Sequence, residues 1–129
     1  MKVLVDTHVL LWSLIEPEKL TEEAADLLRD GNVERYFSAA SCWEIGIKYG
    51  KGFLELPASP TKCVPEAMAK GGLLPLPIRG IDALRACELP IVHSDPFDRL
   101  LVVQARQNGM YIMSRDAIFG SYDVDLIEI

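Results

Sequence analysis

The sequence predicts an α/β fold in which a central, mostly parallel sheet of about five short strands is flanked by helices. Short apolar segments alternate with longer helical segments along the whole chain, and this alternation is typical of a parallel sheet. No internal repeat or flexible linker interrupts the pattern. The chain has 129 residues, enough for one compact domain with its own core, so we expect a single domain over residues 1–129.

The first third of the chain predicts one strand and two helices. "KVLV" at 2–5 is a short apolar run typical of a strand, and "HVLLWSLIE" predicts a mostly buried helix that Pro17 stops. Thr21 has the side chain of an N-cap. The segment "EEAADLLRDG" follows it as an amphipathic helix with two acids in its first turn and Gly31 at its end.

The middle of the chain predicts a second strand and two more helices. "RYFS" at 35–38 is the strand, and "SCWEIGIKYG" at 41–50 is a helix that ends at a glycine. Residues 51–77 contain five of the eight prolines. A helix around 61–70 fits between these prolines and ends at the glycine pair that follows it.

The last part of the chain completes the alternation. "LLPLP" predicts a weak third strand, and its prolines favour the edge of the sheet because proline cannot donate to a strand ladder. Two helices and two strands follow it. We expect this third strand at 73–77, the helices at 81–87 and 96–108, and the strands at 110–114 and 124–129.

Composition and charge exclude several classes of protein. The apolar runs are too short to span a bilayer, and the N-terminus lacks a signal-peptide cleavage site, so we expect a cytoplasmic protein without a membrane partner. Three scattered cysteines fit a reducing compartment better than disulfides or zinc. The net charge of −6 argues against a protein that coats nucleic acid. It does not exclude an enzyme whose acids bind cations, because a metal cancels the charge that repels phosphate.

Three acids lie near the ends of predicted strands, where open parallel sheets form their binding sites. Asp6 follows the first strand directly, Glu44 lies six residues beyond the second, and Asp116 comes shortly after "YIMS". Each also has a structural interpretation. Asp6 and Asp116 can cap helical turns, and Glu44 can form a capping box with Ser41 or an i,i+4 pair with Lys48.

A fourth acid, Asp98, opens the buried face of a helix. If Asp95 is the N-cap and Pro96 the first helical residue, Asp98 is the third and can reach back to the backbone of Asp95. Its face continues with apolar residues such as Leu101 and Val102. A carboxylate on a buried face needs a cation or a dense set of donors. A functional interpretation is therefore stronger for Asp98 than for Asp95.

Four segments together resemble a PIN-domain protein, and specifically the VapC-like toxins of type II toxin–antitoxin pairs. They are "VLVDTHVLLW", "SAASCWEIGIKYGKGFLELP", "HSDPFDRLLVVQA" and "SRD", in the family's order and spacing. The resemblance implies that Asp6, Glu44, Asp98 and Asp116 gather at one edge of the sheet as catalytic acids and metal ligands. It also implies support from Thr7 and Ser114. Oxygen ligands suit Mg²⁺ or Mn²⁺, and zinc is disfavoured by the scarcity of histidine and cysteine.

The resemblance further implies a function and partners. The expected activity is metal-dependent hydrolysis of RNA phosphodiester bonds by an endoribonuclease. The expected partners are an RNA substrate, a small cognate antitoxin protein and a second copy in a homodimer, with the proline-rich residues 51–77 as one candidate docking surface. The alternative is a catalytically silent PIN-like module that only binds protein. A phosphoacceptor receiver domain is disfavoured because no aspartate occurs between Asp30 and Asp82.

The side chains around the acids allow more than one role. Four cations lie near the candidate ligands in the sequence, and either contact RNA phosphates or are solvated charges and partners of the acids: Lys48, Lys51, Arg99 and Arg115. His8 and His93 are interpreted as packing or capping residues rather than bases. Trp12, Trp43 and Phe97 are expected in the core rather than as stacking platforms for bases.

Overall fold

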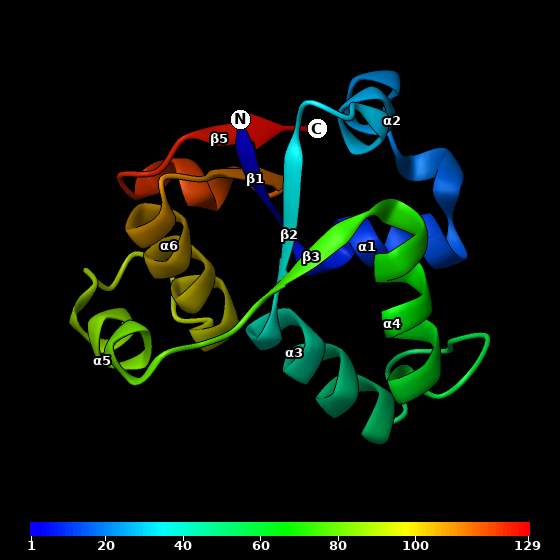
Figure 1. Ribbon diagram of the computed structural model, residues 1–129. Helices are drawn as coiled ribbons and strands as arrows, with labels where there is room; N and C mark the ends of the chain where they lie inside the picture. Colours follow the sequence, from blue (N-terminus) through cyan, green and yellow to red (C-terminus); the bar gives the residue numbers. More distant parts are fainter.

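The computed structural model describes residues 1–129 and has a central sheet of five parallel strands (Figure 1). Their order across the sheet is β3-β2-β1-β4-β5, and every neighbouring pair is parallel. The strands are β1 (Lys2–Val5), β2 (Glu34–Ser38), β3 (Leu73–Leu76), β4 (Tyr111–Ser114) and β5 (Leu126–Glu128). The predicted α/β fold with a parallel sheet is confirmed, and β3 is an edge strand as its proline predicts.

Six α-helices and two short 3₁₀ helices connect the strands. The α-helices are α1 (Thr7–Ile15), α2 (Glu22–Arg29), α3 (Ala39–Gly50), α4 (Pro60–Gly71), α5 (Gly80–Glu88) and α6 (Pro96–Asn108). The 3₁₀ helices are η1 (Pro17–Lys19) and η2 (Ala117–Ser121). Figure 1 shows α5 and α6 side by side on one side of the sheet, with α1, α2 and α4 on the other.

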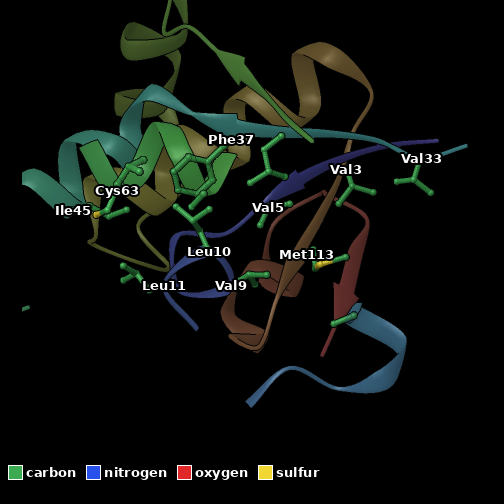
Figure 2. Packing of buried hydrophobic residues seen from close by; sticks show 14 residues of the cluster. Val3, Val5, Val9, Leu10, Leu11, Val33, Phe37, Ile45, Cys63 and Met113 are labelled. Carbon is green, nitrogen blue, oxygen red and sulfur yellow. The ribbon is translucent and has the colours of Figure 1, made fainter. Parts of the chain in front are cut away.

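The two faces of the sheet bury separate hydrophobic clusters. Along β1, Val3 and Val5 join the cluster beneath α1 and α4, which Figure 2 shows, whereas Leu4 joins the cluster beneath α5 and α6. Side chains of a strand alternate between faces, so a strand that is covered on both sides is apolar throughout. The run "VLV" therefore fixes β1 at the centre of a three-layer α/β/α arrangement.

Local signals set most of the helix ends. Thr21 accepts a hydrogen bond from the backbone of Ala24, and α4 and α6 end at Gly72 and Gly109. Both glycines have positive φ, a conformation that side chains with a Cβ disfavour. One predicted end is wrong. Helix α2 stops at Arg29, two residues before Gly31, because Asp30 is already extended.

The strand order reverses direction between β1 and β4. From β1 the chain builds outward through β2 to β3, then crosses back to add β4 and β5 on the other side. In open parallel sheets the helices leave in opposite directions at such a point and open a crevice beyond the carboxyl ends of the two strands. Residues that directly follow β1 and β4 therefore share one crevice.

Candidate active site

Asp6 and Ser114 meet at the carboxyl ends of β1 and β4. The Ser114 hydroxyl donates to Asp6 Oδ2 over 2.7 Å, and the Thr7 amide donates to Asp6 Oδ1 over 2.7 Å. Asp6 thus caps α1, as its structural interpretation predicts, with one oxygen and keeps its other oxygen toward β4. Burial raises the pKa of Asp6, against the opposing effects of the Ser114 hydrogen bond and His8.

Asp116 lies two residues beyond Ser114 and remains exposed. Its backbone amide donates to the Ser114 hydroxyl over 3.0 Å, so one serine links Asp6 to the turn that carries Asp116. The Asp116 carboxylate caps η2 by accepting from the Ile118 amide through Oδ1. This leaves Asp116 Oδ2 without a partner in the protein.

Glu44 is buried on α3, and its position differs from one of its structural interpretations. Helix α3 begins at Ala39 with Ser38 as N-cap, so the predicted capping box between Ser41 and Glu44 is wrong. The helix starts earlier because the Ser38 hydroxyl, at the end of β2, accepts from the Ala40 amide. The predicted pair with Lys48 is confirmed at 2.7 Å between Nζ and Oε2.

Asp98 lies at the third position of α6, one turn from the N-cap Asp95. Asp95 accepts hydrogen bonds from the amides of Phe97 and Asp98, as predicted. The Asp98 carboxylate does not return a bond to the backbone of Asp95. It contacts His93 instead, at 2.6 Å between Nε2 and Oδ2. Burial raises the pKa of Asp98 to about 7, and the negative charges of Asp95 and Asp6 add to this rise.

The candidate ligands form one tight group and two flanking acids. Ligand atoms of His93, Asp98 and Asp116 all lie within 4.8 Å of one another. Asp6 and Glu44 are outside this group. They are nonetheless close enough that the charge of Asp6 raises the pKa of Asp98 and the charge of Glu44 raises that of Asp6. Asp98 and Asp116 thus lie together with His93, whereas Asp6 and Glu44 are linked to this group only through the effects of their charges.

The donor set fits a hard divalent cation. Carboxylate oxygens dominate it, and burial, with a smaller contribution from neighbouring acids, raises the pKa of Asp6 and Asp98. Two buried hydroxyls beside the acids have no hydrogen-bond partner, that of Thr7 next to Asp6 and that of Ser41 one turn before Glu44. Unpartnered buried hydroxyls are costly in a closed core, so these two beside the acids fit a polar site better than a purely structural one.

A pocket of about 250 Å³ opens beside Asp6 and Asp116. His8, Trp12 and Arg115 complete its lining. The Arg115 guanidinium lies 4.3 Å from the centre of the Trp12 ring, within the range of a cation–π contact. Trp12 therefore lines the candidate site and is only half-buried, so its predicted place in the core is wrong. Its ring packs against the Arg115 guanidinium.

Other residues near the acids have structural roles or unexpected exposure. Arg99 does not face outward for RNA, because its guanidinium donates to backbone carbonyls of the segment that precedes α6. Lys48 is bound to Glu44. Trp43 is 62% exposed, so its predicted burial is wrong, and its ring contacts Phe97 edge-on at 5.5 Å.

The sequence interpretation missed His93 as a member of the site. The only signal was its place five residues before Asp98, across the helix start "SDP". Sequence spacing cannot predict that contact, because His93 lies outside the helix that carries Asp98 and the path of the chain before the helix depends on tertiary anchors. The structure provides those anchors through Arg99 and Tyr122.

The fold is a three-layer α/β domain with acids at the reversal point of its parallel sheet. The model of the PIN domain matches residues 3–125. The chain therefore belongs to the PIN-domain family, whose members are generally nucleases. No curated protein sequence matches the chain significantly.

Solved structures with this fold include toxin–antitoxin complexes. VapBC2 from Rickettsia felis bound to a promoter DNA fragment is 12% identical over 99% of this chain and 98% of that chain, with a TM-score of 0.74. VapBC-1 from nontypeable Haemophilus influenzae is 13% identical over 99% and 98%, with a TM-score of 0.65. FitAcB from Neisseria gonorrhoeae is 19% identical over 98% and 96%, with a TM-score of 0.58. These identities show a shared fold.

No helix of this chain is long and apolar enough to cross a membrane.

Proposed function

We propose that this protein is a metal-dependent endoribonuclease and the toxin component of a VapBC-like toxin–antitoxin pair. The observation that carries the proposal is the environment of the Asp98 carboxylate. Its carboxylate is largely buried, contacts only His93, and has a pKa raised to about 7. A buried acid with so few donors, beside other acids, is expected where a cation is bound.

Asp6, Glu44, Asp98 and Asp116 are proposed to hold Mg²⁺ or Mn²⁺. When bound, the cation supplies the charge that admits a phosphodiester to an acidic crevice and makes a water more acidic for in-line attack. The chain prepares the site by orienting its carboxylates. Ser114 and the Thr7 amide hold both oxygens of Asp6, and Lys48 holds Glu44. Little rearrangement is then needed when substrate arrives.

A cation–π contact between the exposed Arg115 and Trp12, beside the acids, supports a nucleic-acid substrate. Arg115 lies over Trp12 at the rim of the pocket that Asp6 and Asp116 line. The guanidinium can contact a phosphate while its face stays on the indole. The 2′-hydroxyl and unstacked bases of single-stranded RNA suit such a shallow pocket better than a rigid duplex does.

The proposed partners are a small antitoxin and a second copy of this chain in a homodimer. Their support is that FitAcB and the VapBC structures share this fold. Within the proline-rich residues 51–77, helix α4 forms one wall of a groove of about 270 Å³ against α3. Its lining is mostly apolar and includes Gly46 and Pro65, so we propose it as the antitoxin-docking surface.

A Gly46→Arg variant tests this surface. A Cβ added at Gly46 meets no atom within 4 Å and Gly46 is exposed, so the variant should fold while its arginine brings a charge to the groove. We expect antitoxin capture to fall at least tenfold, measured by titration with the product of the neighbouring short reading frame. Gly31→Arg is the control, because Gly31 is also unobstructed but lies far from the groove. Unchanged capture by Gly46→Arg would place the antitoxin elsewhere.

RNA cleavage by the purified protein tests the activity. We expect Mn²⁺- or Mg²⁺-dependent cleavage that a chelator stops and that Asp6→Asn reduces at least 100-fold, with RNA ends mapped by sequencing. Asp26→Asn is the matched control, because Asp26 is an exposed acid on α2 whose side chain is 75% exposed. Cleavage that persists in the chelator would contradict a metal-dependent nuclease. Antitoxin capture without cleavage would instead favour the silent protein-binding module.

A further inference from the structure

The segment between α5 and α6 is held by an extensive set of hydrogen bonds from Arg99. The Arg99 guanidinium donates five hydrogen bonds to four backbone carbonyls, two of them to Ala86 and one each to Leu89, Pro90 and His93, at 2.8–3.1 Å. A guanidinium has five N–H groups, so this arrangement uses its full capacity. Arg99 therefore fixes the path of the chain from the end of α5 to His93.

Tyr122 provides a second anchor for the same segment. Its hydroxyl accepts from the His93 amide over 3.0 Å and lies 3.3 Å from the carbonyl oxygen of Pro90. The Tyr122 ring is buried in the cluster beneath α5 and α6. The amide and the carbonyl of His93 are thus both held, the amide by Tyr122 and the carbonyl by Arg99.

These two anchors aim the His93 imidazole at the acids. Nε2 lies 2.6 Å from Asp98 Oδ2, and the tight group of ligand atoms includes Asp116. The imidazole is 25% exposed and belongs to neither hydrophobic cluster, so its role is not to fill the core. The other histidine, His8, lines the pocket beside Asp6 but contacts the Trp12 ring and lies outside the tight group.

We propose that His93 is a nitrogen ligand of the metal site, placed by Arg99 and Tyr122, and that it makes the site prefer Mn²⁺ over Mg²⁺. The inference rests on the metal-dependent nuclease proposed above. Mg²⁺ takes oxygen ligands almost exclusively, whereas first-row transition ions also bind imidazole. One nitrogen among carboxylates therefore adds affinity for Mn²⁺ that Mg²⁺ does not share.

Electron paramagnetic resonance of Mn²⁺ bound to the protein tests the ligand directly. We expect ¹⁴N modulation in electron spin-echo spectra of the wild type, and its loss in His93→Gln. His8→Gln is the matched control and should keep the modulation, because these are the only two histidines in the chain. We also expect His93→Gln to lower the ratio of Mn²⁺ to Mg²⁺ affinity about tenfold, measured by competition.

The outcomes separate this inference from the proposed function. Mn²⁺ that binds the wild type without ¹⁴N modulation overturns the role of His93 and leaves the nuclease in place. Modulation that is lost in His8→Gln and kept in His93→Gln also overturns it. If Mn²⁺ does not bind but Mg²⁺ does, the role of His93 is overturned and the nuclease stays in place; if neither ion binds, both proposals fail.

The positioning role of Arg99 is tested by combining variants. Arg99→Lys keeps the charge but loses the fork of donors, and we expect Mn²⁺ affinity to fall about tenfold with reduced ¹⁴N modulation. In the His93→Gln background the same change should leave Mn²⁺ affinity unchanged, since there is no nitrogen ligand left to place. An equal loss in both backgrounds would show that Arg99 acts only on the fold.

Discussion

Asp82 and Asp98 occupy the same position, the third residue, of two helices that pack against each other. Asp82 in α5 accepts three hydrogen bonds, from the Arg79 amide and from two nitrogens of its guanidinium. The hydrogen bond from the Arg79 side chain holds the pKa of Asp82 below its usual range. Asp98 in α6 contacts only His93, and burial raises its pKa to about 7.

The difference shows how donors distinguish a structural acid from a candidate functional one. Asp82 is buried and pairs with the exposed Arg79 side chain, and it closes a capping arrangement, so it stabilises the start of its helix. Asp98 has the same helical position, but the capping role beside it is already taken by Asp95. Its carboxylate contacts His93 instead, and burial together with the charges of neighbouring acids raises its pKa.

The largest expected contrast is in activity. Asp98→Asn should lower metal-dependent RNA cleavage at least 100-fold, because it removes a charged oxygen from the proposed site. Asp82→Asn should keep cleavage within about threefold of the wild type at a temperature where it is folded. Initial rates on one labelled RNA would measure both variants. Equal loss in the two would contradict the distinction between the acids.

The stabilisation of the fold by bound metal should also differ between the Asp98 and Asp82 variants. At 100 times its dissociation constant, Mn²⁺ should stabilise the wild type by about 2.7 kcal/mol. A tenfold weaker site in Asp98→Asn would reduce this to about 1.4 kcal/mol at the same concentration. Thermal unfolding with Mn²⁺ and with a chelator measures the effect. Asp82→Asn should respond to Mn²⁺ like the wild type, and an unchanged wild-type midpoint would argue against a metal site.

Without metal, the free energy of unfolding should fall more in Asp82→Asn than in Asp98→Asn, the reverse of the order expected for activity. In a chelator, Asp82→Asn should lose about 2 kcal/mol, because a buried amide replaces the carboxylate that accepts from Arg79. Asp98→Asn should lose nothing or gain, since it removes a charge that burial disfavours. Urea unfolding at pH 8 compares the two. A larger loss for Asp98→Asn would make that residue a structural acid.

A further contrast is a pH dependence of the free energy of unfolding that belongs to Asp98. The folded protein holds a proton on Asp98 up to a pKa of about 7, whereas an unfolded aspartate loses it near 3.9. Between these values the folded state binds more protons, so stability falls as pH rises, by at most about 1.4 kcal/mol per pH unit. Unfolding in chelator from pH 5 to pH 8 should show this slope. Asp98→Asn should flatten it and Asp82→Asn should not.

Local signals predicted much of the fold and of the site. The apolar runs predicted β1 and the buried helices, and the prolines predicted the edge position of β3. The N-caps Thr21 and Asp95 and the end of α6 at Gly109 also follow from nearest neighbours in the sequence. The four acids came from their motifs in family order. Errors arose where two nearby residues could both cap a helix: Ser38, not Ser41, is the N-cap of α3.

The sequence by itself determined which segments form strands and helices, because hydrophobic period and capping act over a few residues. It also determined that Asp6 and Asp116 follow strands. Only the tertiary structure decided which residues meet, because that depends on the strand order and on contacts between distant residues. The reversal between β1 and β4 joins Asp6 to Ser114, 108 positions apart. Arg99 and Tyr122 carry His93 to the acids through bonds that no local pattern encodes.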